Sequence, residues 1–552
     1  MDFRQKVIYQ IYPKSFYDSD GDGLGDLRGI IEKVPYLQSL GIDMVWLNPF
    51  FVSPQRDNGY DVADYRAVDP RFGTMADFEE LVAVLKSVGI GIMLDMVFNH
   101  TSTTHPWFQA ALAGDEKYQA YYLIEAPKPD GSLPTNWQSK FGGPAWAPFG
   151  TTGKYYLHLY DQSQTDLNWR NPAVRNECAQ IINFWRQKGV QGFRFDVINV
   201  IGKPEPLMDA IAGTDGRTRY TDQPVVETYL KQLNQMSFGR DPEIVTVGEL
   251  SSTTMAASVA YTKPQNHELN MAFNFHHLKV DYDHGQKWTD QPVNYRLLKE
   301  TLTKWETNLA ADGGWPALFW NNHDQPRALD RFGDVGRYRV QAAEMLANVV
   351  HLSRGTPFVY QGEELGMSDP EYTSMDDYVD VEAHNAYQAL LTAGKSPATA
   401  FRIVQRKARD NSRTPMQWQN DVQAGFTTGT PWLRATNQAI IHQGAPMSQQ
   451  IFSYYQRLIA LRHTFKLISD GDFLAVPTVD DDVYGFERRW GTERLLVVAN
   501  FSGHTKPFQV PRDYLDARVL ISNYVDAKPN DQILQPYQST AFYVGNHLLR
   551  GD

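Results

Sequence analysis

Short apolar runs, rich in β-branched and aromatic side chains, recur along the first 360 residues of the chain. Amphipathic stretches with helical spacing, such as residues 77–88 and 177–188, lie between them. Near-continuous apolar strands that alternate with helices are typical of a parallel sheet in the α/β class. Eight such strands favour a closed (β/α)₈ barrel, the TIM barrel. The predicted strands are residues 7–12, 44–47, 91–97, 192–196, 244–249, 271–275, 317–320 and 357–360.

Two long intervals and a change of pattern interrupt this alternation. Loop-rich insertions follow the third predicted strand and the eighth (about 362–445), at strand ends that form the active-site face of a barrel. Beyond a predicted helix at 449–465, short strands between turns indicate a small all-β domain. The predicted domains are a barrel over 1–100 and 169–470, a loop-rich inserted domain over 101–168, and a C-terminal β-sandwich over 471–552.

The composition argues against several classes of partner. The formal net charge is −12, whereas a nucleic-acid binder carries a basic face, and any anionic ligand needs a local basic patch. No apolar run reaches the ~20 residues of a membrane span, and the first residues do not resemble a secretion signal. The single cysteine, Cys178, cannot form an internal disulfide. We therefore expect a cytoplasmic protein with no nucleic-acid or membrane partner and no organic cofactor, and we favour a monomer.

Three predicted strands end in an acidic residue, namely Asp196 on the fourth, Glu249 on the fifth and Asp324 on the seventh. Strand ends point into the mouth of a barrel, so the three side chains are expected to converge there. Arg194 shares a strand face with Asp196 and is expected to pair with it and keep it ionised. Glycoside cleavage uses such a set: a carboxylate that attacks the anomeric carbon, an acid that protonates the leaving oxygen, and a negative group that favours the cationic transition state.

Four short motifs, in this order and at this spacing, resemble the α-amylase family of glycoside hydrolases. They are Asp95–His100, Gly192–Asp196, Val247–Glu249 and Asn322–Asp324. The resemblance implies that Asp196 is the nucleophile, Glu249 the general acid/base and Asp324 the transition-state stabiliser. It also implies that His100 and His323 hydrogen-bond the bound glucose. The family retains anomeric configuration, which predicts that the two reacting carboxyl groups lie ~5–5.5 Å apart.

Three further segments resemble the oligo-1,6-glucosidase branch of that family, namely residues 57–61, 164–168 and 409–418. Thr165 stands where the branch usually has proline. The resemblance implies that Asp57 and Arg413 clamp the far hydroxyls of the terminal glucose and that Tyr60 stacks on its ring. Such a closed pocket makes the enzyme exo-acting. Val197, after the nucleophile, goes in this branch with α-1,6 and related linkages rather than α-1,4.

The segment after the sixth predicted strand is similar to the trehalose-6-phosphate hydrolases of this branch. It contains His277, Lys279 and Lys287, although Asp283 and His284 differ from the Pro-Asn usual there. A loop at the catalytic face of a barrel can present these basic residues to the leaving group, where an acidic protein needs local positive charge to hold a phosphate. The resemblance implies hydrolysis of α,α-trehalose 6-phosphate to glucose and glucose 6-phosphate, with the unphosphorylated glucose in the closed pocket.

The same motifs leave other functions open. The nearest alternative is an oligo-1,6-glucosidase or dextran glucosidase acting on isomalto-oligosaccharides, and a sucrose isomerase is a weaker one. The lysine-bearing segment separates the first of these from a sugar-phosphate hydrolase. A remote alternative is a non-enzymatic relative, such as the heavy chain of an amino-acid transporter. Those chains carry a membrane anchor and often lose catalytic acids, whereas this chain keeps all three.

A loop after the first predicted strand spaces acidic residues at alternate positions, with glycines between them. This pattern suits Ca²⁺, a hard cation that binds several oxygen ligands. It resembles the first part of an EF-hand loop but lacks the closing glutamate, because Gly29 stands there. In the glucosidase branch this loop binds calcium in a structural role. The implied ligands are the side chains of Asp18, Asp20, Asp22 and Asp26 and the Leu24 carbonyl.

Overall fold

Eight parallel strands form the centre of the protein in a computed structural model, which describes residues 2–436 and 438–545. The strands are β1 (Ile8–Ile11), β2 (Met44–Leu47), β5 (Gly91–Met96), β11 (Gly192–Phe195), β12 (Val245–Leu250), β13 (Met271–Asn274), β14 (Ala317–Leu318) and β15 (Thr356–Tyr360). They pair in the order β13-β12-β11-β5-β2-β1-β15-β14, and a bridge from Ala272 to Pro316 joins the two ends. The predicted (β/α)₈ barrel is confirmed.

The barrel strands are buried along most of their length. Every residue of β1, β2, β11 and β15 is buried, which explains their unbroken apolar runs. The seventh strand ends at Leu318, two residues earlier than predicted. The physical reason lies in the residues that follow: Trp320 leaves the sheet, and its indole N–H donates to the Leu346 carbonyl (2.8 Å) of an outer helix.

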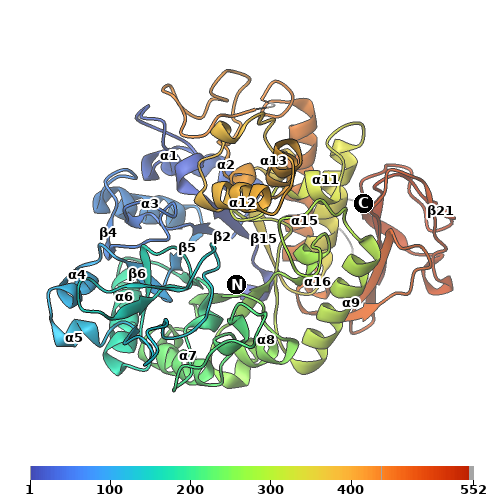
Figure 1. Cartoon of the computed structure of the whole chain (residues 1–552). Coiled ribbons are helices and arrows are strands. Elements are labelled where there is room, and N and C mark those ends of the chain that lie inside the picture. Colours follow the sequence, from blue (N-terminus) through green and yellow to red (C-terminus); the bar gives the residue numbers. More distant parts are fainter. Residues whose placement is uncertain (1, 437, 546–552) are drawn as a thin grey trace.

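Helices surround the strands (Figure 1). One of them shows why they form: a capping box between Thr74 and Asp77 starts the helix at 75–87, which buries Phe78, Leu81 and Leu85 against the barrel. The helices of the barrel layer are α1 (Leu27–Glu32), α2 (Val34–Leu40), α3 (Met75–Ser87), α6 (Pro172–Gln187), α7 (Val225–Met236), α8 (Met255–Thr262), α9 (Tyr295–Asp312), α10 (Ala328–Phe332), α11 (Arg339–Leu352), α15 (Pro446–Thr464) and α16 (Lys466–Asp470).

The insertion after β5 has its own small core. Trp137 and Trp146 are buried in it, and the core extends to Val197, directly after Asp196, and to Val200. The insertion therefore packs against the barrel rim where β11 ends. Its elements are the antiparallel pair β6 (His100–Ser102) and β10 (Gln164–Asp166), the sheet of β7 (Ile124–Glu125), β9 (Tyr155–Leu157) and β8 (Trp146–Pro148), and helices α4 (Pro106–Leu112) and α5 (Glu116–Gln119).

The remaining additions lie after β2 and after β15. A short antiparallel pair, β3 (Phe51–Val52) and β4 (Asp64–Val68), follows β2. The segment after β15 forms α12 (Val381–Thr392), α13 (Pro397–Lys407) and α14 (Asp410–Arg413). Among the described helices, none combines the length and the apolarity needed to cross a membrane.

The C-terminal part is all-β, as predicted, and lies at one side of the barrel near α9 (Figure 1). One antiparallel sheet runs β16-β17-β18-β22-β20, and a two-stranded sheet pairs β19 with β21. Their bounds are β16 (Asp472–Ala475), β17 (Val483–Trp490), β18 (Glu493–Asn500), β19 (Lys506–Pro507), β20 (Arg518–Ser522), β21 (Ile533–Leu534) and β22 (Ser539–Val544). Leu496, Leu534 and Phe542 share a buried cluster. The domain boundaries, and the sandwich arrangement over 471–552, stay predictions.

Candidate active site

The three acids at the strand ends lie around one cavity. Asp196 follows β11 directly, Glu249 is close to the end of β12, and Asp324 lies in the loop after β14. All three line a cavity of about 460 Å³ at this face of the barrel, a volume typical of a small-molecule site. The expectation that strand ends bring these carboxyl groups together therefore agrees with the structure.

Arg194 joins the acids electrostatically. Its buried guanidinium lies 2.7 Å from Asp196 Oδ1 and 2.6 Å from Asp95 Oδ1, and its other terminal nitrogen contacts Glu249. Because one planar group serves both Asp196 and Glu249, these two carboxyl groups lie side by side. Asp95 is the first residue of the motif Asp95–His100, and no role was predicted for it. Its Oδ2 accepts a hydrogen bond from the Tyr60 hydroxyl (3.0 Å).

The two neighbouring carboxyl groups both have raised pKa values. Burial raises the pKa of Glu249 to about 7, and the charges of Asp196 and Asp324 add to this effect against the opposing pull of Arg194. Burial also raises the pKa of Asp196, while Arg194 and a hydrogen bond with Glu249 lower it. A hydrogen bond between two carboxyl groups needs one proton. Glu249, with the more basic carboxylate, is the group that holds it near neutral pH.

Asp324 is held in its ionised form. Burial alone would raise its pKa, but His323, Arg409 and Arg413 outweigh burial and keep that pKa well below the usual value. Arg413 Nη2 lies 2.6 Å from Asp324 Oδ1, and His323 Nε2 lies 3.2 Å from Oδ2. Near neutral pH the cavity therefore contains a fixed negative charge beside the two carboxyl groups that exchange a proton.

A buried network closes one end of the cavity. Asp57 lies 3.0 Å from Arg409 Nη2 and accepts a hydrogen bond from Gln164 Nε2 (3.0 Å), and Arg409 also contacts Asp380 (2.5 Å). Arg413 pairs with Asp324 instead. Sequence reasoning assigned Asp57 and Arg413 but missed Arg409, although Arg409 belongs to the same segment, 409–418. Two arginines four positions apart in that segment were the available signal.

Tyr60 and His100 line the cavity beside this network, and His323 packs against Tyr60. The rings of Tyr60 and His323 stack in parallel with centroids 5.3 Å apart. His323 Nδ1 lies 2.9 Å from the side-chain amide nitrogen of Gln10, which donates, so the ring hydrogen is on Nε2 and faces Asp324. Burial lowers the pKa of His100 to about 4, which keeps its ring neutral.

Several further cations line the same cavity. Lys279 follows β13 and faces the cavity, as does Lys287, whose ammonium is paired with Glu382 (2.8 Å). Lys140, from the insertion, and Arg217, from the segment after β11, line the same space. Neither had a predicted role, because the bare sequence places both in segments with no motif.

His277 does not reach this cavity, contrary to the sequence-based prediction. Its ring is buried, Nε2 donates to the Phe319 carbonyl (2.8 Å), and it lines a separate apolar cavity with Trp305. The physical reason is the turn after β13: residues 276–279 form a short 3-10 helix, which turns the His277 ring toward Phe319 and Trp320, while Lys279 faces the catalytic cavity.

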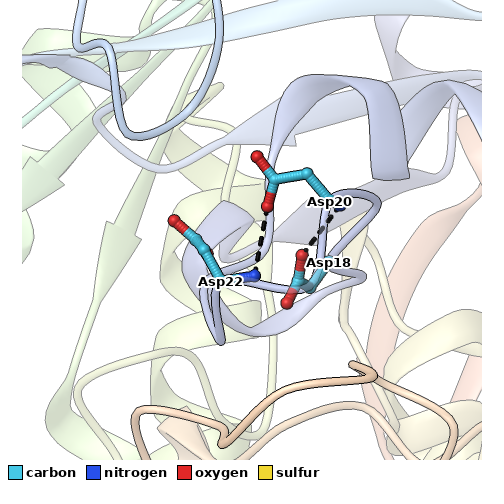
Figure 2. A group of neighbouring side chains, drawn as sticks. All are labelled: Asp18, Asp20 and Asp22. Carbon is cyan, nitrogen blue, oxygen red and sulfur yellow. Dashed lines mark hydrogen bonds between the residues drawn. The ribbon is translucent and has the colours of Figure 1, made fainter.

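The acidic loop after β1 brings together three of its predicted ligands. One carboxylate oxygen from each of Asp18, Asp20 and Asp22 lies within 4.8 Å of the others (Figure 2). Asp26 is used differently: its carboxylate caps α1 by accepting from the Gly29 N–H (2.7 Å), and it also accepts from Ser19. The three clustered carboxylates are hard oxygen donors on a tight loop and fit a calcium ion.

Comparisons with known proteins agree with this geometry. The family described as "Alpha amylase, catalytic domain" matches residues 10–471. The trehalose-6-phosphate hydrolase of Bacillus subtilis (strain 168) is 46% identical over 550 residues, covering 98% of both chains. The oligo-1,6-glucosidase of Parageobacillus thermoglucosidasius is 42% identical over 98% of this chain and 99% of its own. The crystal structure of the trehalose-6-phosphate hydrolase of Bacillus licheniformis superposes with a TM-score of 0.93 at 46% identity, covering 98% and 99% of the two chains.

Proposed function

Because this chain belongs to the α-amylase family of glycoside hydrolases, we propose that it is a retaining, exo-acting α-glucosidase that hydrolyses α,α-trehalose 6-phosphate to glucose and glucose 6-phosphate. The observation that carries the proposal is one cavity lined by the paired carboxyl groups, by the buried network around Asp57 and by several cations. Full-length similarity to trehalose-6-phosphate hydrolases supports the choice of substrate.

In the proposed mechanism Asp196 attacks the anomeric carbon and forms a covalent glucosyl ester. Glu249 donates its proton to the departing oxygen of glucose 6-phosphate, and in the second step it takes a proton from the water that cleaves the ester. Asp324 stabilises the positive charge that develops on the sugar ring. The side-by-side placement of Asp196 and Glu249 on one guanidinium supports retention, because inverting enzymes need a wider gap that admits a water.

The unphosphorylated glucose occupies the closed end in this proposal. His100 contacts its hydroxyls, and Asp57, with its partner Arg409, binds the hydroxyls farthest from the scissile bond. His323 and Arg413, predicted to contact the glucose, are buried behind Asp324 and position that carboxylate. Tyr60 offers one ring face to the sugar. Because the network behind Asp57 is buried and fully paired, no second sugar extends beyond it, and cleavage is restricted to the chain end.

The phosphorylated glucose occupies the open side, where Lys279 and Lys287 provide positive charge. Lys287 is neutralised by Glu382 in this structure, so its contribution requires that it exchange this partner for the phosphate. The phosphate-bearing sugar is an ionic molecule that a membrane retains, which supports a cytoplasmic site of action. We also retain monomer as the expected state.

Catalytic efficiency on three substrates tests this proposal. We expect kcat/KM on trehalose 6-phosphate to exceed that on trehalose or isomaltose by about 100-fold, as for one or two charge-assisted hydrogen bonds. The double variant Lys279→Ala/Lys287→Ala should raise KM for trehalose 6-phosphate more than for trehalose. A preference for isomaltose, the substrate class of the oligo-1,6-glucosidase alternative, or indifference to the phosphate would refute the assignment.

We further propose a structural Ca²⁺ in the loop after β1, bound by Asp18, Asp20 and Asp22 and by the Leu24 carbonyl, while Asp26 caps α1 beside it. The ion would offset two of the three negative charges of these adjacent carboxylates. It lies on a loop that supplies no catalytic acid, so its role is stability rather than chemistry.

A further inference from the structure

Two lysines of the catalytic cavity lack an acidic partner. Among the described residues, no carboxylate lies within ion-pair distance of Lys140 or Lys279, whereas the neighbouring Lys287 pairs with Glu382. Lys140 is instead held by neutral oxygens, since its ammonium donates to the Tyr160 hydroxyl and to Ser251 Oγ (both 3.0 Å). Burial lowers the pKa of Lys140 and Lys279, and the charges of Glu249 and Asp196 only partly offset this effect at Lys140. A buried ammonium without a direct ion pair costs free energy in a folded protein. Both lysines are therefore placed to meet a negative group from outside the chain.

Arg217 brings a third positive charge to the same space. It lines the cavity and is tied to Asp215 of its own turn (2.5 Å), which leaves much of the side chain exposed. Burial, and then the charge of Arg217, lowers the pKa of Lys279. Burial also lowers the pKa of Lys140, where Glu249 acts against it and Arg217 adds to it. Arg217 is thus close enough to repel both ammonium groups, although the three residues come from three separate segments.

Their position relative to the acids points to the leaving group. Lys140 contacts Ser251, two residues after Glu249, the proposed proton donor to the departing sugar. The charges of Asp57 and Arg409, by contrast, are paired within the chain. The unpaired cations therefore face the half of the cavity that receives the departing sugar.

We infer that Lys140 and Arg217, with Lys279, form the subsite for the phosphate of the leaving sugar, and that Lys140 and Arg217 determine specificity for phosphorylated over neutral glucosides. The inference rests on the proposed function and extends its phosphate site to two residues from other segments. A phosphate dianion offers several acceptor oxygens, which a guanidinium and two ammonium groups satisfy together. Its charge also relieves the mutual repulsion of the three cations.

The test compares trehalose 6-phosphate with trehalose in single variants. For Arg217→Gln and Lys140→Met we expect the ratio of kcat/KM on the phosphorylated substrate to that on trehalose to fall by about 10-fold or more, the usual effect of losing one charge-assisted hydrogen bond. Arg217→Lys, which keeps the charge, should recover part of the ratio. The matched controls are Arg219→Gln, on the same turn, and Lys154→Met, on the same insertion. Lys154 is exposed and Arg219 is half-buried, with its Nε donating to the Asp209 carbonyl; neither lines the cavity, and both should keep the wild-type ratio.

Inhibition by products gives a second readout. With p-nitrophenyl α-glucoside as the reporter substrate, Arg217→Gln should raise the inhibition constant of glucose 6-phosphate much more than that of glucose. Equal losses on both substrates, or an unchanged ratio, in a wild type that prefers the phosphorylated sugar would overturn this inference and leave the proposed function intact. A wild type without that preference would overturn the proposed function, and the subsite with it.

Discussion

At the scale of single residues, Arg194 sets the electrostatics of the site. One buried guanidinium contacts three carboxylates, so the cluster of Asp95, Asp196 and Glu249 holds more negative charge than one cation neutralises. The least costly response is to keep one proton within the cluster. Glu249 retains that proton up to near neutral pH because burial and the neighbouring carboxylates raise its pKa, which suits a general acid.

This balance predicts a bell-shaped dependence of kcat/KM on pH. Burial raises the folded-state pKa of Glu249 to about 7, so its acid form persists to that pH and activity declines as pH rises further. Asp196 must be ionised to attack, and since burial raises its pKa as well, activity declines on the acidic side as the pair takes up a second proton. The check is a pH profile of kcat/KM on trehalose, whose leaving sugar needs the proton of Glu249. Glu249→Gln, assayed on p-nitrophenyl α-glucoside, which needs little protonation to depart, should keep activity and show no alkaline decline. A wild-type profile that stays flat from neutral to strongly alkaline pH would contradict the account.

The acids at the strand ends could be predicted from the sequence, whereas only some of the polar residues around them could. Asp196 and Glu249 are predictable because a strand end has one orientation in a barrel. Lys140, Arg217 and Arg409 lie on loops whose paths depend on tertiary packing. The local sequence pattern does not predict such paths. His277 was misplaced because a 3-10 turn, rather than an extended loop, follows β13 and turns its ring toward Phe319.

At the scale of elements, the segment after β15 closes the cavity. Arg409 stands between α13 and α14 and bridges Asp57, on the loop after β2, to Asp380, just before α12. The eight strands and the two insertions could be predicted from the apolar runs in the sequence and from their spacing. The pairing of Arg409 with Asp57 joins residues far apart in the chain, so it required the folded structure.

Arg409→Lys tests the closed end. Lysine keeps the charge, but it lacks the planar guanidinium that contacts both Asp57 and Asp380. Breaking a buried ion pair costs about 3–5 kcal/mol. We expect kcat/KM to fall by about 10- to 100-fold on trehalose 6-phosphate and trehalose alike, because both place the same glucose at this end. Arg406→Lys, at an exposed position of α13 beside Asp290, is the matched control. A loss confined to the phosphorylated substrate would show that Arg409 belongs to the phosphate side instead.

At the scale of the whole molecule, the acidic loop links two segments that are far apart in the sequence, namely the loop after β1 and the segment after β15. Asp18 accepts from the Thr427 hydroxyl, and the Gly23 carbonyl accepts from the Trp432 N–H (3.1 Å), so the loop after β1 is fastened to the segment after β15. An ion that rigidifies this loop stabilises the contact between the first and last strands of the barrel. The arrangement of these segments was not predictable from the loop's own spacing.

Removal of calcium tests this link. A chelator should lower the melting temperature by about 2 °C or more, because an ion that binds only the folded state adds to the free energy of unfolding. Added Ca²⁺ should restore it, and Asp20→Asn/Asp22→Asn should abolish the response. Calorimetry with and without chelator makes the measurement, and an unchanged wild-type transition would mean that the loop does not depend on an ion.

The central claim concerns the molecule acting as a unit: one acid pair cleaves trehalose 6-phosphate with retention, while the closed end holds glucose and the open side holds the phosphate. A proton NMR time course of the reaction with trehalose 6-phosphate tests it most directly. The account predicts that the substrate is consumed and that free glucose appears first as the α-anomer, with β-glucose growing only as mutarotation proceeds. Initial β-glucose, or a substrate that remains intact, would contradict it.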